Sequence, residues 1–272
     1  MPLVYLNGNL VEEEEAKISV FDHGLLTGDG VFESVVIRDG KPFALRRHLA
    51  RLARSAAAIG LAHPSEEELA AAVGAVAAAA DLCFGKIRLT VTAGRGPLGS
   101  ARLASEPTVV VAAEQLPDPP PAVAVAVVPW ARNERGAVAG AKTISYAENV
   151  VALAYAAEHG ANEALFLNTA GKLCEGSGTN VFCGIGGELV TPPLSSGCLA
   201  GVTRGLVLEC VPVSERDITL AELEQASEAF LSSTTRGVHP IRRIGERELD
   251  WPGPLTAQAA EAFADLLAAG QP

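Results

Sequence analysis

The sequence has no apolar run long enough to span a membrane, and its first residues, Met1 to Tyr5, contain no basic segment leading into an apolar one. It is also short of basic residues, because 21 Lys and Arg stand against 32 Asp and Glu, for a formal net charge of −11. This balance argues against a general nucleic-acid surface but leaves room for local arginine sites. We therefore expect a cytoplasmic protein with neither a membrane nor a nucleic acid as a partner.

Several motifs of metal and hydrolytic chemistry are also missing. The 5 Cys are scattered and include no Cys-x-x-Cys pair, which favours reduced thiols. The 5 His show no His-Glu-x-x-His spacing, so we expect no metal. There is no Gly-x-Ser-x-Gly elbow, and the glycine-rich loop from Gly94 to Gly99 lacks the Gly-Lys-Ser/Thr ending of a nucleotide phosphate loop.

The chain is long enough for one large or two ordinary domains. It has 272 residues, 49% of them hydrophobic, which is enough for a sizeable core. Leu116 to Pro121 contains three consecutive prolines without amide protons, and such a stretch favours an extended spacer. We therefore predict a smaller N-terminal α/β domain (residues 1–115), a linker (116–121) and a larger C-terminal α/β domain (122–272) that carries Lys142.

Apolar periodicity predicts both helices and strands, an α+β composition. A hairpin is expected to turn at Asn7-Gly8, and strands over 31–38 and 42–44 are expected to pair around Asp39-Gly40. Ser65-Glu-Glu-Glu68 predicts a capping box before a helix. The other expected helices are 45–59, 148–159 and 257–269, and the other expected strands are 86–92, 108–113, 122–128, 181–185, 189–191 and 228–231.

One lysine and one glutamate stand out from this background. Most lysines are solvated surface charges, but Lys142 has Ala139 to Ala141 before it and Ile144 after it, which offer little solvation. A desolvated amine is driven toward its neutral, nucleophilic form. A turn at 169–171 then delivers Glu175 at a Gly-Ser-Gly bend, where it is either a functional carboxylate or a simple turn residue.

The segments that carry Lys142 and Glu175 resemble the corresponding segments of the class IV aminotransferase family, the fold-type IV enzymes that use pyridoxal 5′-phosphate (PLP). The resemblance runs from Leu6 to Pro240 and is most specific around Lys142 and from Glu175 to Asn180. It implies an α+β, two-domain fold with the cofactor in the interdomain cleft and Lys142 as the Schiff-base lysine. It also implies that Glu175 keeps the pyridine nitrogen protonated, so that the ring can accept electrons.

The same resemblance assigns the remaining cofactor ligands. His48-Leu-Ala-Arg51-Leu52 matches the family pattern in which the arginine binds the phosphate. The segment from Leu199 to Arg204 resembles a helix start that binds phosphate, and 232–235 resembles a second hydroxyl-rich turn. The expected cofactor-binding residues are Arg51, Lys142, Glu175, Leu199, Gly201, Val202, Thr203, Ser233 and Thr234.

The substrate side is implied in the same way. In the family, the loop from Asp22 leads onto a strand that lines the substrate pocket, a place held here by Phe32 and Glu33. An arginine at the place of Arg88 helps to recognise the substrate carboxylate in the branched-chain members. D-amino-acid transaminases usually carry an Arg-x-His pair in the following loop, for which Arg95 or Arg102 could substitute here. The family uses this loop at a homodimer interface to help close the neighbouring active site. The expected substrate-binding residues are Phe32, Arg88, Arg95 and Thr235.

No subgroup pattern is matched completely. Glu33 and Arg88 stand where lyases commonly carry threonine and lysine, Phe32 stands where D-amino-acid transaminases usually carry tyrosine, and Lys86 stands where branched-chain enzymes often carry tyrosine. We favour a transaminase of D-amino-acid or broad specificity that moves an amino group between an amino acid and a 2-oxo acid. An aminodeoxychorismate lyase, which makes 4-aminobenzoate and pyruvate, and a branched-chain L-amino-acid transaminase are the alternatives.

Overall fold

The computed structural model describes residues 3–270, and its chain divides into two compact units. Unit 1 takes the chain up to Pro117 together with Ala141–Tyr146, and unit 2 takes Asp118–Gly140 and the chain from Ala147 onward. The mixture of helices and sheets confirms the predicted α+β composition. The proline-rich segment predicted as a linker lies where the chain first passes from one unit to the other.

Lys142 lies in unit 1 and not with the C-terminal part of the chain, where the sequence placed it. The reason is that residues 141–146 return to β3 (Gly30–Arg38) and hydrogen-bond along its first residues. Phe32 donates its backbone N–H to the carbonyl of Lys142 at 3.1 Å, and Ile144 donates to the carbonyl of Gly30 at 3.0 Å. A short segment of the second half of the chain is thereby built into the first unit.

Unit 1 is built on an antiparallel six-stranded sheet in the order β2-β1-β6-β5-β3-β4. The predicted hairpin is confirmed, with Asn7 and Gly8 at φ values of 46° and 98°. The strand after Asp39-Gly40 is shorter than predicted, because Ala44 takes a left-handed conformation, φ 52°, where α2 begins. The other elements are β1 (Leu3–Leu6), β2 (Asn9–Glu12), η1 (Glu13–Glu15), α1 (His23–Thr27), β4 (Lys41–Pro42), α2 (Leu45–Ala58), α3 (Glu66–Ala80), β5 (Phe84–Thr92) and β6 (Thr108–Gln115).

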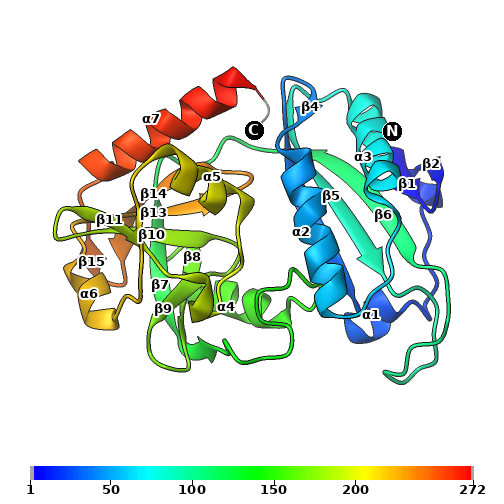
Figure 1. Ribbon diagram of the computed structural model, residues 1–272, viewed down its shortest axis with the longest axis horizontal. Helices are drawn as coiled ribbons and strands as arrows, with labels where there is room; N and C mark the ends of the chain where they lie inside the picture. The colour runs from blue at the N-terminus through cyan, green and yellow to red at the C-terminus, as the bar shows by residue number, and fades with distance from the viewer. Residues whose placement is uncertain (1–2, 271–272) are drawn as a thin grey trace. The chain divides into compact units, whose positions relative to one another are not determined.

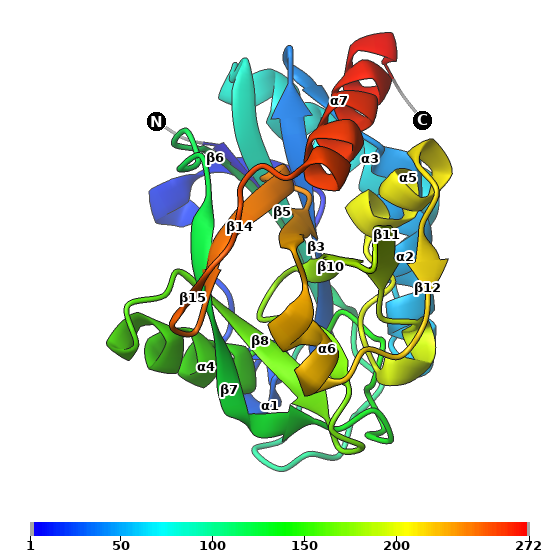
Figure 2. The same cartoon turned by 90° about the vertical axis from the view of Figure 1, so that its left-hand side faces the viewer.

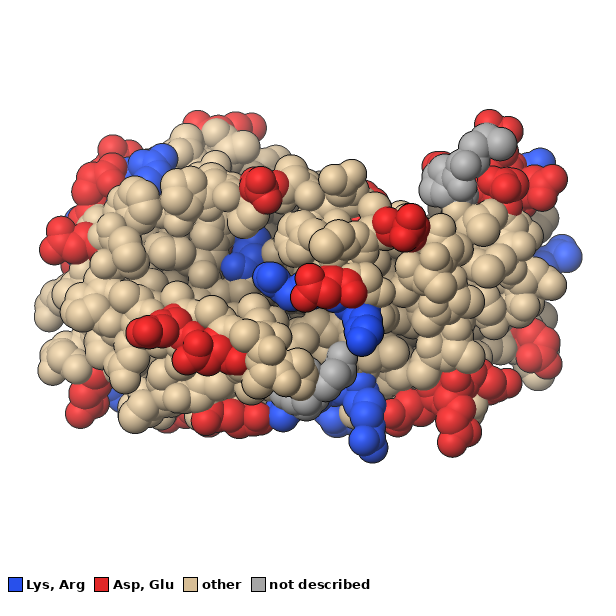
Figure 3. Space-filling model, turned by 90° about the horizontal axis from the view of Figure 1, so that it is seen from above, with Lys and Arg blue, Asp and Glu red and all other residues tan. Residues whose placement is uncertain are grey.

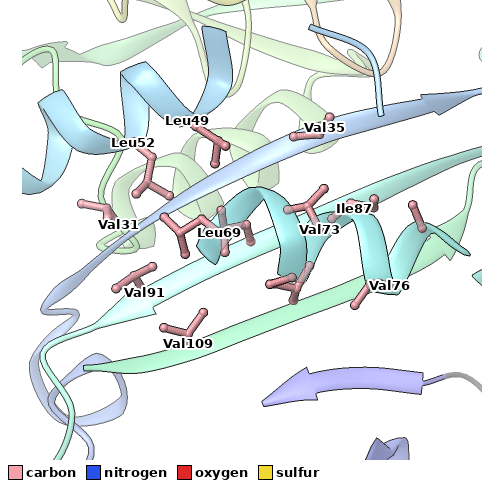
Figure 4. Close-up of a cluster of buried hydrophobic side chains, with 14 of the residues drawn as sticks. Val31, Val35, Leu49, Leu52, Leu69, Val73, Val76, Ile87, Val91 and Val109 are labelled. Atoms are coloured by element: carbon pink, nitrogen blue, oxygen red, sulfur yellow. The ribbon is translucent and has the colours of Figure 1, made fainter. Parts of the chain in front are cut away.

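One face of this sheet packs against α2 and α3 (Figures 1 and 4). Alternate residues of β3, Val31 and Val35, point into a cluster with Leu49 and Leu52 of α2. The predicted capping box holds the start of α3, since Ser65 Oγ accepts from the Glu68 amide at 3.2 Å and the Glu68 carboxylate accepts from the Ser65 amide at 2.8 Å. The period-2 strands and the helical apolar stripes therefore produce one core, as their patterns indicate.

Unit 2 is built on a mixed sheet in the order β12-β11-β10-β13-β14-β7-β8-β9, with β15 paired to β14. The pairs β14–β7, β7–β8 and β11–β12 are parallel, and the other pairs are antiparallel. The strands are β7 (Val123–Arg132), β8 (Glu163–Asn168), β9 (Leu173–Gly176), β10 (Asn180–Ile185), β11 (Glu188–Thr191), β12 (Ser214–Glu215), β13 (Glu228–Ser233), β14 (Gly237–Ile244) and β15 (Arg247–Glu248). The helices are α4 (Ala147–Glu158), η2 (Leu194–Ser196), α5 (Val202–Cys210), α6 (Leu220–Gln225) and α7 (Pro254–Ala269).

Both faces of the unit 2 sheet are covered. On β7, Val123 and Val125 belong to a core cluster that includes Leu223 of α6, whereas Ala124 and Ala126 belong to a second cluster that includes residues of α4. Figures 1 and 2 both show α4 beside β7 and β8. A strand buried on both faces reads as a continuous apolar run, as residues 122–128 do.

Among residues 3–270, no helix is long and apolar enough to cross a membrane. The face drawn in Figure 3 carries acidic side chains at many separate places, in keeping with the net charge of −11. Within the same part of the chain, no group of three or more His, Cys, Asp and Glu side chains is arranged to hold a metal ion. All five cysteines are free thiols.

Candidate functional site

Lys142 is fixed through its own backbone. Its amide N–H donates to Ser55 Oγ of α2 at 3.0 Å, and its carbonyl accepts from the Phe32 amide at 3.1 Å. Its half-buried side chain places Nζ 4.3 Å from the centre of the Phe32 ring and 5.8 Å from that of the Tyr146 ring. The amine therefore has a defined position against two aromatic rings.

The guanidinium of Arg88 also lies over the Phe32 ring. The Cζ atom of Arg88 lies 3.8 Å from the ring centre, and the Tyr146 ring meets the Phe32 ring edge-on at 5.1 Å. Partial removal of its guanidinium from water lowers the pKa of Arg88 below its usual value, although the residue is exposed overall, and the guanidinium remains a cation near neutral pH. The predicted substrate-binding residues Phe32 and Arg88 thus lie together with Lys142 in unit 1.

Arg51 is buried and paired with a carboxylate. Its Nε donates to Glu33 Oε1 at 2.7 Å and its Nη2 donates to Glu33 Oε2 at 2.6 Å, while His48 Nδ1 lies 2.8 Å from the same Oε2. Burial would raise the pKa of Glu33, but the charge and hydrogen bonds of Arg51 and the hydrogen bond of His48 outweigh burial and lower that pKa to about 2. Burial lowers the pKa of His48, the charges of Arg51 and Lys142 add to the lowering, and Glu33 opposes it. Nδ1–H is the donor in the contact with Glu33, because a carboxylate oxygen accepts.

The two loop arginines have different roles in the structure. Arg95 is exposed, and its backbone forms an isolated bridge with Asp22. Arg102 pairs with Asp29 through Nε at 2.6 Å and donates Nη1 to the carbonyls of Ile59 and Gly60 at 2.8 and 2.7 Å. Arg102 therefore fastens the loop to the end of α2, and of the two it is the less suited to a substrate carboxylate.

In unit 2, Glu175 is held by a neighbouring segment. Its Oε2 accepts from the Leu199 amide at 2.8 Å, and its side chain is only 14% exposed. Arg132 places Nε 3.5 Å from Glu175 Oε1, donates to Asn149 Oδ1 at 2.9 Å and lies 4.1 Å above the Phe166 ring. The Glu175 carboxylate is thereby fixed in unit 2 by the Leu199 amide and the Arg132 guanidinium.

The start of α5 lies next to the Glu175 contact. Asn180 Nδ2 donates to the Leu199 carbonyl at 2.8 Å, and a Cβ at Gly201 would come within 2.0 Å of Asn180 Oδ1. Gly201 is the N-cap residue, so α5 begins at Val202 without a side-chain cap, and Thr203 is buried in its first turn. Backbone N–H groups at such a helix start suit a phosphate.

The hydroxyl-rich segment is partly strand and partly turn. Ser232 and Ser233 end β13 and do not belong to the turn that the sequence predicted, whereas Thr234 and Thr235 do lie in a turn. Ser232 pairs with Asn180 in the sheet, which brings this segment beside the Leu199 contact. The hydroxyls of Ser232 and Ser233 are buried and, in the described part of the chain, have no protein partner, as expected of donors that serve a ligand.

Each unit by itself offers donors of a kind that suits a phosphorylated aldehyde cofactor. Unit 1 offers an amine at Lys142, and unit 2 offers a carboxylate at Glu175, an uncapped helix start and buried hydroxyls at Ser232 and Ser233. A fold and a donor set of this kind define a cofactor enzyme of the PLP type. A family model described as amino-transferase class IV matches residues 30–244, and the chain belongs to this family, whose cofactor is PLP.

The relatives carry two kinds of name. A Methanocaldococcus jannaschii protein with the provisional name branched-chain-amino-acid aminotransferase is 35% identical over 277 residues, covering 97% of this chain and 96% of that protein. The D-alanine aminotransferase of Staphylococcus epidermidis is 30% identical over 280 residues, covering 97% of each. The two names agree on amino-group transfer and differ on the substrate.

Solved structures agree with this family. The branched-chain aminotransferase of the archaeon Thermoproteus uzoniensis, solved with norvaline, matches with a TM-score of 0.91 at 34% identity, covering 98% of this chain and 95% of that one. A Mycobacterium tuberculosis protein described as a hypothetical aminotransferase, solved in its PLP-bound form, matches with a TM-score of 0.85 at 26% identity, covering 98% of this chain and 99% of that one. The predicted family, fold class and cofactor are confirmed.

Sequence reasoning did not find the residues that hold the predicted ligands. The family pattern placed Glu33 with Phe32 on the pocket-lining strand, but its side chain is 0% exposed and pairs with Arg51 of α2. His48 was noted only as part of a motif. Nothing in the sequence singled out Ser55 or Arg132 as functional residues, because serines on helices and arginines at strand ends are common. An ionisable residue inside the apolar run from Val31 to Ile37 was the one available sign of Glu33.

Proposed function

We propose that this protein is a PLP-dependent transaminase that moves an amino group between an amino acid and a 2-oxo acid. The observation that carries the proposal is Lys142, whose backbone is fixed by Ser55 and Phe32 and whose amine lies against the Phe32 ring. In this role Lys142 supplies the amine that links covalently to the cofactor aldehyde, as a Schiff base. When bound, PLP supplies an electron sink for the substrate α-carbon.

Three groups of residues hold the cofactor in this proposal. Arg51 and the first turn of α5, with Gly201, Val202 and Thr203, bind the phosphate, together with the hydroxyls of Ser233 and Thr234. Glu175 accepts a hydrogen bond from the pyridine nitrogen, and Leu199, whose amide Glu175 binds, packs on the ring. Charge-assisted hydrogen bonds to an anion are worth about 1.5–3 kcal/mol each, enough for firm retention of the cofactor.

Lys142 also moves the proton in this proposal. Once the substrate amino group has displaced it from the cofactor, Nζ would take the proton from the substrate α-carbon and deliver it to the carbon that carried the cofactor aldehyde. The Phe32 and Tyr146 rings support this role, because their contacts with the side chain hold Nζ at a defined place in unit 1. The base and the covalent ligand are then one residue.

Arg88 is the proposed anchor of the substrate carboxylate, because its guanidinium shares the Phe32 ring with the amine of Lys142. An arginine at this place favours a branched-chain L-amino acid as the first candidate substrate. D-alanine is the second candidate, because a relative of that name is 30% identical over nearly the whole chain. This order differs from the preference drawn from sequence alone, since the position of Arg88 against Lys142 was not known there.

We also propose a homodimer in which the loop with Arg95 reaches the partner's site. Arg95 is exposed, and the neighbouring Leu98 and Leu103 are 74% and 65% exposed. Apolar side chains of this size on a loop suit an interface. Sedimentation at working concentration should give twice the mass of one 28.0 kDa chain, and an active monomer would refute this part of the proposal.

The experiment offers the purified protein 2-oxoglutarate with L-leucine, L-valine or D-alanine in turn, and pyruvate with D-glutamate. It measures the amino acid and the oxo acid that form in each case by mass spectrometry. We expect transfer from at least one amino acid, with L-leucine or L-valine fastest. Transfer from D-alanine alone would support the second candidate. No transfer from any of them, with release of pyruvate and 4-aminobenzoate from aminodeoxychorismate, would replace the proposal with the lyase.

A further inference from the structure

Glu33 occupies a position that the strand pattern reserves for an apolar side chain. It lies between Val31 and Val35 in the alternation of β3, and it pairs in register with Leu89 of β5. Those three residues belong to the core cluster beneath α2 and α3, and Glu33 itself is 0% exposed. A carboxylate on this face is costly unless all its oxygens are satisfied.

The carboxylate is satisfied by one edge of a guanidinium. Arg51 donates Nε and Nη2 to the two oxygens at 2.7 and 2.6 Å, and His48, one turn earlier on α2, donates Nδ1–H to Oε2 at 2.8 Å. A two-bond contact of this kind fixes the plane of a guanidinium as well as its distance. Glu33, which His48 fixes in turn, thereby holds Arg51 in one orientation.

The orientation of the Arg51 guanidinium is also fixed relative to Lys142. Ser55, one turn after Arg51 on the same helix, accepts the Lys142 amide at 3.0 Å. Phe32, the neighbour of Glu33 on β3, donates to the Lys142 carbonyl at 3.1 Å. The strand that carries Glu33 and the helix that carries Arg51 therefore both bind the lysine segment, and all of these residues belong to unit 1.

The negative charge of Glu33 argues that the site needs more from Arg51 than a positive charge that attracts an anion. A site that needed only a positive charge for an anion would be weakened by a carboxylate that neutralises Arg51. Buried ion pairs are also not dependable sources of stability, since apolar replacements are often neutral or better. The remaining role is geometric, because a preoriented donor loses less freedom on binding.

We propose that Glu33 is a positioning residue that orients the guanidinium of Arg51 toward the PLP phosphate, with His48 as its second support. The inference rests on the proposed function in one respect, the assignment of Arg51 as a phosphate ligand. Glu33 touches neither substrate nor cofactor in this proposal and acts only through Arg51.

The test is titration of the full-length apoprotein with PLP and, separately, with pyridoxal, which lacks the phosphate. Glu33→Gln keeps the size of the side chain but replaces one acceptor oxygen with a donor, which cannot accept from Arg51. We expect the dissociation constant of PLP to rise about tenfold and that of pyridoxal to change by less than about twofold. His48→Gln should give a smaller loss with the same selectivity, and it decides the question if Glu33→Gln does not fold.

A matched control and a partner variant complete the design. Glu228 is an equally buried carboxylate that accepts the Leu255 and Thr256 amides at the start of α7, so Glu228→Gln should leave the ratio of the two affinities unchanged. Arg51→Gln should weaken PLP at least as much as Glu33→Gln does. The double variant should be no weaker than Arg51→Gln alone, since the two residues act as one unit.

Each other outcome contradicts a defined part of the inference. Unchanged or tighter PLP binding by Glu33→Gln, with Arg51→Gln weakened, would overturn the positioning role and leave Arg51 as a ligand. Equal losses for PLP and pyridoxal would show a general structural defect and also overturn it. No effect of Arg51→Gln would refute the phosphate assignment itself and the inference that rests on it.

Discussion

The guanidinium of Arg88 lies 3.8 Å from the centre of the Phe32 ring, and Lys142 Nζ approaches the same ring to 4.3 Å. Arg88 comes from β5, Phe32 from β3 and Lys142 from the segment that returns to β3. A cation over an aromatic face is stabilised by about 0.5–2 kcal/mol, depending on its desolvation. The Phe32 ring thus contacts both Arg88, the proposed anchor of the substrate carboxylate, and Lys142, the proposed covalent amine.

Replacing Arg88 should therefore affect substrates through their carboxylate. Arg88→Gln is expected to raise KM for amino acids about tenfold to a hundredfold, because one or two charge-assisted hydrogen bonds are lost. Steady-state kinetics with the best amino acid measure this, and Lys86→Gln on the same strand, which loses an exposed ion pair with Glu114, is the control. An unchanged KM in Arg88→Gln would remove Arg88 from the substrate site.

Glu175 should matter for turnover more than for cofactor retention. Glu175→Gln keeps an oxygen that can accept from the Leu199 amide but removes the negative charge that favours a protonated ring nitrogen. We expect PLP to remain bound and turnover to fall by about 10²-fold or more, as when an electrostatic contribution of several kcal/mol is lost. Bound PLP is quantified in parallel, and near-normal turnover at full occupancy would leave Glu175 as a turn residue.

The buried Glu33 carboxylate should make the apoprotein acid-sensitive. Its pKa of about 2 in the folded chain is below the ordinary value of 4.5, so the folded state binds fewer protons than the unfolded state. The stabilisation is complete above about pH 4.5 and is lost as the pH falls toward about 2, in total on the order of 3 kcal/mol. Urea unfolding of the wild-type apoprotein should show a steeper loss of stability between about pH 5 and about pH 3 than Glu33→Gln does. Parallel curves would contradict the lowered pKa.

Local signals in the sequence predicted local structure well. Asn7-Gly8 predicted a tight hairpin, and Ser65 with Glu68 predicted a helix start, because each depends on residues only a few positions apart. The apolar residues Leu49, Leu52 and Ala56 of α2, which recur at steps of three and four, are buried as their spacing indicates. These features need no knowledge of which distant segments meet.

The contacts that hold the candidate site join residues that lie far apart in the sequence. The Glu33–Arg51 pair depends on how α2 crosses β3, and the place of Lys142 depends on the chain returning to β3 after more than a hundred residues. Arg132 reaches Glu175 only because β7 lies beside β8, which pairs with β9. The residue types could be taken from the resemblance, but their partners required the three-dimensional arrangement.

The most direct measurement of the central claim is the location of the covalent cofactor. The protein has five lysines, Lys17, Lys41, Lys86, Lys142 and Lys172, so peptide mass spectrometry after borohydride reduction can distinguish all of them. The account predicts the pyridoxyl group on Lys142 alone, with no stable adduct and no turnover in Lys142→Ala. A pyridoxyl group on any other lysine of the wild-type protein, or turnover retained in Lys142→Ala, would contradict it.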